Sequence, residues 1–254
     1  MLDIKIIKCL TDNYSYLLRD KETNTVAVVD PSEADPIDFE IQKTYKKLDY
    51  ILNTHHHFDH VGGNSKLKGK YNCKVAGFGK DKHRIPEIDI NLKDGQKWKN
   101  ELFECEILHV PGHTAGHICI YIEKINALFT GDTLFSLGCG RIFEGTYTEM
   151  FNSLNKMKKF PKKTKIYCGH EYTKKNSDFC LSIDTNNSKL RHKIDKIKND
   201  IKLNKPTIPS TLEDELECNI FLRADNLEIQ KQLGINSSDP IETFTKLREL
   251  KDNF

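Results

Sequence analysis

Three apolar runs in this sequence end in the same way: a glycine follows the run, and a histidine or an aspartate follows the glycine. Glycine lets the backbone turn sharply and approach a ligand closely. Side chains placed just past the ends of rigid strands form a fixed site that stays open to substrate. The pattern therefore predicts a strand-rich domain with its chemistry at the strand ends. The three residues are His113, Asp132 and His170.

The densest group of candidate ligands is the segment THHHFDH at residues 54–60, directly after the apolar run at residues 50–52. In an extended segment, residues two apart point to the same side, so His55 and His57 can face one metal ion while His56 points away. Asp59 and His60 follow where the chain turns, and they can serve a second ion. A surface run of histidines is the alternative, but an expression tag contains no interleaved aspartate and follows no buried strand.

Seven candidate ligands exceed the four that a tetrahedral zinc ion takes, and they suit two ions that share a carboxylate. Asp132 is the expected bridge because it lies apart in sequence from the other ligand pairs. A metal-bound water ionises near neutral pH and supplies a nucleophile, so the set predicts acyl-bond hydrolysis without a serine or cysteine nucleophile. We expect one ion on His55, His57 and His113, and the other on Asp59, His60 and His170.

The remaining histidines and the cysteines have weaker patterns. His117 opens a predicted strand, and we expect it either to support a metal ligand or to be structural. His83, His109 and His192 are expected to be ordinary packed or surface residues. The eight cysteines form no C-x-x-C pair and have no neighbouring base. They are expected to be reduced, several of them buried, and not catalytic.

Composition narrows the class of protein. The chain has 254 residues, of which 37% are hydrophobic and 30% charged, and its net charge is +2. A nucleic-acid-binding protein would show a stronger basic excess. No stretch reaches the roughly 18 apolar residues of a membrane span, and the N-terminus resembles neither a signal peptide nor a transit sequence. We expect a cytoplasmic protein without nucleic-acid or membrane partners.

The hydrophobic pattern changes near residue 171. Before it, β-type runs predict short strands, and a helix is expected after Thr148, which would cap it. Beyond it, helical spacing predicts helices near residues 190–201, 210–221 and 241–252, and no further strands. The predicted organisation is an α/β domain at residues 1–172 and a small helical domain at residues 173–254. The predicted strands cover residues 3–10, 14–19, 25–30, 50–54, 74–78, 102–110, 117–123, 127–130 and 165–168.

The ligand motifs resemble those of the metallo-β-lactamase superfamily, whose H-x-H-x-D-H motif matches residues 55–60. Within it, the chain is similar to the glyoxalase II family along nearly its whole length. The resemblance implies an αβ/βα sandwich followed by a small all-helical domain. The stretches that carry it are DNYSY, HHHFDHVGGN, PGHTAGHICIY, FTGDTLFSLGCGRIFEG, YCGHEYT and PSTLEDELECNIFLR, with the ending LRELKD.

The resemblance also implies where a glutathione thioester binds. The family holds glutathione through a basic residue and an aromatic residue after the GCG turn, which are Arg141 and Phe143 here. Members often have lysine and tyrosine at these positions, so this chain keeps the charge and lacks one phenol hydroxyl. Tyr172 matches the tyrosine after the last metal histidine. Arg248 and Lys251 match a basic pair expected to meet the glycine carboxylate of glutathione.

The implied reaction is hydrolysis of S-D-lactoylglutathione to glutathione and D-lactate by a metal-bridging hydroxide, in methylglyoxal detoxification. Asp132, Asp59 and His170 are the expected catalytic residues. The expected cofactor is two divalent ions, zinc first, with iron or manganese also compatible with His and Asp ligands. A monomer is implied. The alternatives are another hydrolase of the same fold, such as a lactonase or a β-lactamase, a mononuclear-iron persulfide dioxygenase, and a non-catalytic metal-binding module.

Overall fold

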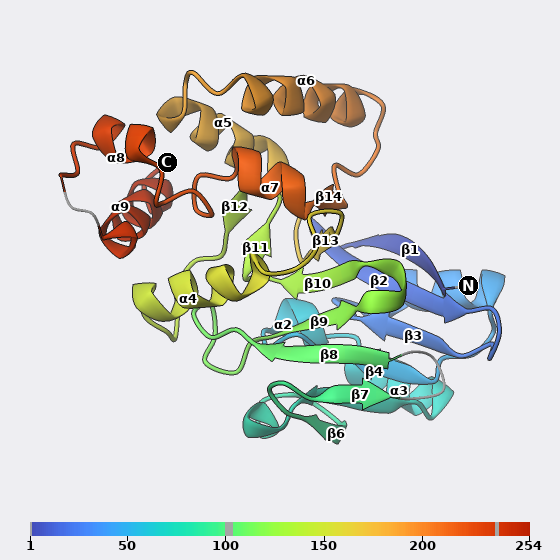
Figure 1. The fold of residues 1–254 in the computed structure, drawn as a ribbon. Coiled ribbons are helices and arrows are strands. Elements are labelled where there is room, and N and C mark those ends of the chain that lie inside the picture. The colour runs from blue at the N-terminus through green and yellow to red at the C-terminus, as the bar shows by residue number, and fades with distance from the viewer. Residues whose placement is uncertain (1, 100–103, 237–238) are drawn as a thin grey trace. The chain divides into compact units, whose positions relative to one another are not determined.

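The structure is a computed structural model that describes residues 2–99, 104–236 and 239–254. The chain forms two compact units (Figure 1). The first unit comprises Met1–His109 with Gly116–Gly131, and the second comprises Val110–Ala115 with Asp132–Phe254. The domain boundary predicted at residue 172 falls inside the second unit. The two units are defined by contacts between residues, whereas the predicted boundary marks a change in hydrophobic pattern, so that boundary stays a prediction.

The first unit contains a six-stranded sheet in the order β1-β2-β3-β4-β5-β6. Strands β1 to β3 are antiparallel, and β3 to β6 are parallel. Strand β3 has the sequence VAVV and is buried on both faces, which is typical of a central strand. The strands are β1 (Leu2–Cys9), β2 (Asn13–Asp20), β3 (Val26–Val29), β4 (Tyr50–Leu52), β5 (Lys74–Phe78) and β6 (Ile88–Leu92).

Helices cover one face of this sheet. Helices α1 (Ala34–Thr44) and α3 (Asn64–Tyr71) bury Ile37, Ile41 and Leu67 in one apolar cluster with alternate residues of the strands, among them Val28 and Ile51. Burial of such side chains stabilises the layer by roughly 1.5–3 kcal/mol for each one. The short helix α2 (Phe58–Val61) precedes α3 and carries part of the predicted ligand motif.

The other face of the sheet packs against strands β7 to β10, which pair antiparallel. Tyr16 of β2 meets Phe129 of β10 edge to face, with ring centroids 5.3 Å apart. Tyr50 of β4 meets Trp98 of β7 in the same way at 5.6 Å. These strands are β7 (Lys97–Lys99), β8 (Glu104–His109), β9 (Ile118–Ile122) and β10 (Ala127–Gly131).

The second unit is mainly helical and also contains two short antiparallel strand pairs, β11 with β12 and β13 with β14. Figure 1 shows its helices in yellow to red. Among the helices within the described residues, none combines the length and apolarity that a bilayer crossing requires. The elements are β11 (Leu134–Phe135), β12 (Gly138–Cys139), α4 (Tyr147–Met157), β13 (Lys165–Cys168), α5 (Thr173–Ile183), α6 (Ser188–Lys202), β14 (Ser210–Thr211), α7 (Leu212–Cys218), α8 (Leu227–Gln232) and α9 (Pro240–Asp252).

Several predicted boundaries are wrong. The strand expected to reach Thr54 ends at Leu52, since the chain bends there to present the histidines. Helix α4 is capped by Thr146 rather than Thr148, because the Thr146 hydroxyl accepts from the Glu149 amide and the Glu149 carboxylate accepts in return from the Thr146 amide. The helix expected at residues 210–221 covers only Leu212–Cys218 and follows a short strand, β14, where no strand was expected.

Most other predicted elements are confirmed within a residue or two. The strand at residues 74–78 and the one at 165–168 have the predicted bounds. Helices α6 and α9 cover the apolar stripes predicted near residues 190–201 and 241–252. Residues 102 and 103 of the strand predicted at 102–110 lie outside the described residues, and its described part is β8.

Candidate metal centre

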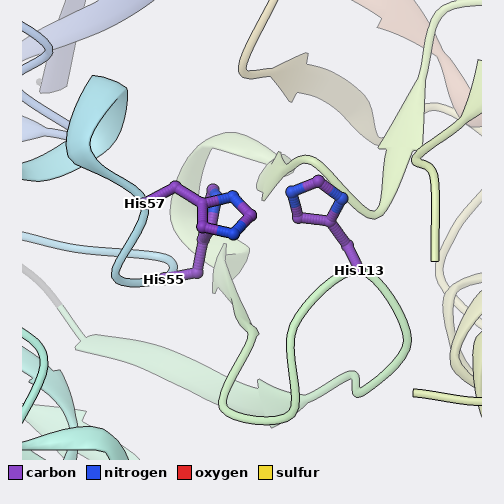
Figure 2. Close-up of side chains that lie close together, drawn as sticks. All are labelled: His55, His57 and His113. Carbon is purple, nitrogen blue, oxygen red and sulfur yellow. The ribbon is translucent and has the colours of Figure 1, made fainter. Parts of the chain in front are cut away.

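The first group of candidate ligands lies in the segment that follows β4. Helix α2 turns the chain directly after His57, so His60 comes back towards His55, and their ring centroids are 4.1 Å apart. The ring centroids of His55 and His57 are 4.8 Å apart, and Figure 2 shows both rings extending from this segment. His55 and His60 are completely buried. The fold thus gathers three imidazoles from six consecutive residues.

Asp30 and Thr54 orient two of these rings. The Asp30 carboxylate lies 3.0 Å from His60 Nδ1, and it accepts from the Thr54 hydroxyl at 2.6 Å and the Thr54 amide at 2.7 Å. The Thr54 hydroxyl gives its single proton to Asp30, so its oxygen accepts from His55 Nδ1 at 3.0 Å. Both rings therefore carry their proton on Nδ1, and Nε2 is the nitrogen able to bind a metal.

The sequence interpretation missed Asp30. Its oxygen lies within 4.8 Å of ligand atoms of His55 and His60. Because both its oxygens already accept hydrogen bonds, we assign it to orientation of the ligands rather than to the metal. Asp30 has a left-handed backbone with φ 47°, a conformation that aspartate adopts more readily than most residues. Its signal was present, since Asp30 follows an apolar strand as the predicted ligands do.

Two further side chains support this group. Asn13 donates from Nδ2 to the Asp59 carboxylate at 2.9 Å and to the Asp59 carbonyl at 3.1 Å. His117 stacks on His55, with ring centroids 4.6 Å apart and an interplanar angle of 20°. Gly131 has φ 46°, and a Cβ atom there would come within 2.8 Å of His117 Nε2. His117 is thus a packed neighbour of a candidate ligand, and the glycine is needed for that close approach.

His56 has a different partner from its two neighbours. Its Nδ1 lies 3.1 Å from the Asp81 carboxylate, which also accepts from Arg84 Nε at 2.6 Å. Asp81 is buried and His56 nearly so. This ion-pair cluster engages the middle histidine of the motif, in keeping with the expectation that His56 is not a metal ligand. His109, expected to be an ordinary packed residue, stacks on Phe78.

The second unit carries the second group, His113, Asp132 and His170. Asp132 Oδ2 lies 3.5 Å from His113 Nε2 and 3.2 Å from His170 Nε2. His113 Nδ1 donates to the Arg141 carbonyl at 2.9 Å, so Nε2 is again the metal-binding nitrogen. Figure 2 shows His113 on its own loop. One carboxylate oxygen close to two imidazole nitrogens is the arrangement expected of a shared metal ligand.

The donor set in both groups fits divalent metal ions. Every member offers an imidazole nitrogen or a carboxylate oxygen, which are donors that zinc, iron and manganese accept. Three of the imidazoles are held by hydrogen bonds that fix the Nδ1–H tautomer, as metal-ligating histidines usually are. Most members are buried, and a buried carboxylate such as that of Asp132 is unfavourable without a positive charge beside it. A bound metal cation would supply that charge.

Two aromatic residues predicted to bind substrate lie against the second group. Tyr172 stacks on His170, with ring centroids 4.8 Å apart and an interplanar angle of 6°. Phe143 meets His113 at 5.1 Å. Phe143 is 62% exposed and Tyr172 is 37% exposed, so both present surface to a ligand.

The predicted basic residues differ in accessibility. Arg248 is only 3% exposed, and its Nη1 donates to the Cys139 carbonyl at 2.8 Å while Nη2 donates to Asp252 at 3.0 Å. Arg141 is exposed and lies 3.4 Å from the same Asp252 carboxylate. Lys251 donates to the Lys175 carbonyl at 3.1 Å. Arg141 and Lys251 are thus accessible to a carboxylate, whereas the Arg248 guanidinium is engaged within the unit.

The cysteines are as predicted. All eight lie among the described residues, all are buried, and none forms a disulfide. Burial raises the pKa of Cys168 and of Cys180 to about 12. Thiols with such pKa values carry almost no thiolate at neutral pH, which argues against Cys168 and Cys180 as nucleophiles.

Comparison with known proteins identifies the family. Residues 10–170 match the family described as the metallo-beta-lactamase superfamily, and residues 171–254 match the hydroxyacylglutathione hydrolase C-terminus. A hydroxyacylglutathione hydrolase of Pelagibacter ubique is 55% identical over 253 residues and covers 100% of both chains. Another, of Rhodospirillum rubrum, is 43% identical and covers 100% of this chain and 99% of its own.

A solved structure gives the same fold. The BLEG-1 B3 metallo-beta-lactamase matches with a TM-score of 0.66 and 21% identity, covering 87% of this chain and 99% of its own. At that identity the likeness concerns the fold alone. The α/β sandwich predicted from the sequence, with helices at its C-terminal end, is confirmed. This chain belongs to the hydroxyacylglutathione hydrolases of the metallo-beta-lactamase superfamily.

Proposed function

We propose that this chain hydrolyses S-D-lactoylglutathione to glutathione and D-lactate, the glyoxalase II reaction of methylglyoxal detoxification. The observation that supports this most directly is the Asp132 carboxylate beside the Nε2 atoms of His113 and His170. A carboxylate in that position can share two cations, and such cations can supply the activated water that thioester hydrolysis without a side-chain nucleophile needs. The relatives named hydroxyacylglutathione hydrolase, which match over the whole chain, support the choice of substrate.

In this proposal the two groups of ligands together hold two divalent ions, with zinc the first choice and iron or manganese also suited to these donors. When bound, such ions polarise the thioester carbonyl and lower the pKa of a water that serves as nucleophile. Asp132 would help to hold the ions and to orient the nucleophilic water. The proposed ligands are His55, His57 and His113 for one ion and Asp59, His60 and His170 for the other, with Asp132 shared.

The glutathione part would be held by residues of the second unit. Arg141 and Lys251 offer accessible positive charge to its carboxylates, and Phe143 and Tyr172 offer aromatic surface. Arg248 would contribute to glutathione binding from its position next to Cys139 and Asp252. The thiolate of glutathione leaves readily, so no dedicated general acid is needed. We further propose a cytoplasmic monomer that requires neither nucleic acid nor membrane.

The decisive experiment is an assay of S-D-lactoylglutathione hydrolysis by the purified protein, combined with metal analysis. We expect turnover with about two metal ions per chain, loss of turnover in chelator, and recovery when zinc is added. Asp132→Asn should remove turnover, while Asp94→Asn, at an acidic residue that pairs with the His109 amide, should not.

Other outcomes would favour other functions. One iron per chain with oxidation of glutathione persulfide would replace this proposal with the dioxygenase alternative. Turnover of lactones or β-lactams without turnover of the thioester would favour a different hydrolase of the same fold. Metal bound without any turnover would indicate a binding module.

A further inference from the structure

The hairpin formed by β11 and β12 lies between Asp132 and Arg141 in sequence, and helix α7 holds it through two polar side chains. The Glu215 carboxylate accepts from the Leu137 amide at 2.8 Å. Asn219, the residue after α7, donates from Nδ2 to the Gly138 carbonyl at 3.1 Å and to Glu215 at 2.9 Å. The turn of the hairpin is therefore bound by side chains from a segment about 80 residues away in sequence.

Helices α5 and α9 hold the same hairpin. Asn176 of α5 donates to the Ser136 carbonyl at 3.1 Å, and Cys180 of α5 donates from Sγ to the Leu137 carbonyl at 3.1 Å. Arg248 of α9 donates to the Cys139 carbonyl at 2.8 Å. Backbone groups along the hairpin from Ser136 to Cys139 thus bond to side chains from three helices, in addition to the pairing of its two short strands.

The tip of this hairpin is conformationally strained. Leu137 has φ 59°, a left-handed conformation that a leucine adopts at a cost. Such strain persists only where the surroundings determine the conformation. Leu137 is completely buried, with its amide bonded to Glu215 and its carbonyl to Cys180. The helices thus keep the hairpin in a shape that it would not hold alone.

The end of the hairpin touches two candidate metal ligands. Gly140 packs so closely on the Asp132 carbonyl that no side chain fits there. The next residue, Arg141, accepts from His113 Nδ1 through its carbonyl at 2.9 Å. A shift of this segment would therefore move the backbone of Asp132 and the support of the His113 ring.

We infer that Glu215 and Asn219 are positioning residues for the metal centre. They hold the hairpin so that Gly140 and Arg141 fix the Asp132 backbone and the His113 tautomer. This inference rests on the proposed function insofar as Asp132 and His113 are metal ligands. The helical part of the second unit would then align catalytic groups, in addition to any contact with glutathione.

The chemistry of the two side chains suits this role better than simple packing. Glu215 and Asn219 are completely buried, where an apolar side chain would pack at no desolvation cost. Burial raises the pKa of Glu215, which shows how unfavourable its ionised form is there. The cost of burying these polar groups is compensated by their hydrogen bonds to the backbone of the hairpin at Leu137 and Gly138.

Hydrogen exchange measured by mass spectrometry tests the inference without reference to catalysis. In Asn219→Ala, exchange of the peptide covering residues 133–141 should rise about tenfold or more while the sheet β1 to β6 stays as in the wild type. Metal affinity, measured by chelator competition, should fall about tenfold or more in the same variant. Glu215→Gln keeps an acceptor for the Leu137 amide and should stay close to the wild type in both measurements.

The matched control is Glu217→Gln on the same helix. The Glu217 carboxylate pairs with Lys189 at the surface rather than with the hairpin, so neither measurement should change. Unchanged exchange at residues 133–141 in Asn219→Ala would overturn the inference. Should that variant fail to fold, Asn219→Asp, which keeps the size of the side chain and removes the Nδ2 donor, decides in its place.

Failure of the proposed function can be told apart from failure of this inference. A wild type that binds metal without thioester turnover would refute the function, yet the exchange and metal-affinity comparisons could still support the positioning role. A loosened hairpin with unchanged metal affinity would overturn the inference and leave the thioesterase proposal intact.

Discussion

At the scale of single residues, the candidate centre depends on which nitrogen of each histidine carries the proton. His55, His60 and His113 each have Nδ1 next to an acceptor, so their Nε2 atoms are basic. The acceptors differ: a hydroxyl oxygen, a carboxylate and a backbone carbonyl. The carboxylate of Asp30 is the common support of the first two, since Thr54 also donates to it.

Asp30→Ala should therefore weaken metal binding although Asp30 is not expected to touch the metal. We expect the affinity to fall about 10- to 100-fold, since removal of such supporting partners has effects of that size. Competition with a chromophoric chelator measures it. Thr54→Ser, which keeps the hydroxyl that donates to Asp30, is the control and should bind metal normally. Equal affinities of Asp30→Ala and wild type would refute the supporting role.

Lys251 predicts a pH dependence of substrate binding. Burial, with the positive charges of Lys175 and Arg248, lowers the pKa of Lys251 to about 8, against the opposing effects of Cys180 and Asp178. The ammonium is present below that pH and is lost above it. If it binds a glutathione carboxylate, KM for the thioester should rise as pH passes above about 8.

Steady-state kinetics from about pH 6.5 to 9 checks this expectation. Lys251→Met should have a KM roughly tenfold higher at pH 7, with kcat nearly unchanged, because the contact is remote from the reacting carbonyl. Its KM should no longer rise near pH 8. A wild-type KM that is flat across this interval would count against Lys251 as a carboxylate-binding residue.

At the scale of elements, helix α4 supports the loop that carries His113. Ser153 of α4 donates to the Pro111 carbonyl at 2.8 Å. Gly112 has φ 148°, and a Cβ atom there would lie 2.8 Å from the Cβ of Met150. The loop and the helix are therefore in contact with no space for a side chain, which fixes the backbone just before His113.

Gly112→Ala should accordingly disturb both stability and metal binding. We expect a loss of about 1–3 kcal/mol in the free energy of unfolding, from backbone strain and the clash with Met150. Denaturant unfolding and chelator competition measure the two effects. Gly69→Ala is the matched control, because Gly69 lies in helix α3 with open space around it, and it should stabilise by about 0.5–1 kcal/mol. A harmless Gly112→Ala would show that the loop can move.

At the scale of the whole molecule, the candidate ligands are divided between the two units. His55, His57, Asp59 and His60 belong to the first, and the other three belong to the second. Under the proposed function, the ligands of the ions come from distant parts of the sequence, so metal binding and folding are linked.

Removal of metal should thus lower the melting temperature of the whole chain. A ligand present at about 1,000 times its Kd stabilises by about 4 kcal/mol, which for a chain of this size corresponds to roughly 10 °C. Calorimetry with and without chelator measures the shift. His55→Ala and His113→Ala, one from each unit, should each lose most of it. A shift that persists in either variant would contradict the ligand role proposed for that histidine.

The sequence by itself predicted the fold class, most of the strands, the helices α4, α6, α7 and α9, and the candidate ligands. It could do so because each depends on local patterns: period-two and helical hydrophobic spacing, and donor residues placed just after apolar runs. The family motifs followed from the same residues. The errors have different causes. The cap at Thr146 is a local capping box that the hydrophobic pattern does not reveal, whereas the short strand β14 depends on pairing with the distant strand β13. Helices α1 and α3 had no individual prediction.

Only the tertiary structure decided which residues support the ligands. Asp30 and Arg141 reach their histidine partners from 30 and 28 residues away, and Glu215 reaches Leu137 from 78 residues away. No periodicity encodes such pairs, because a hydrogen bond depends on the separation of two atoms in space rather than along the chain. The burial of Arg248, which the sequence predicted only as part of a basic pair for the glycine carboxylate of glutathione, was decided in the same way.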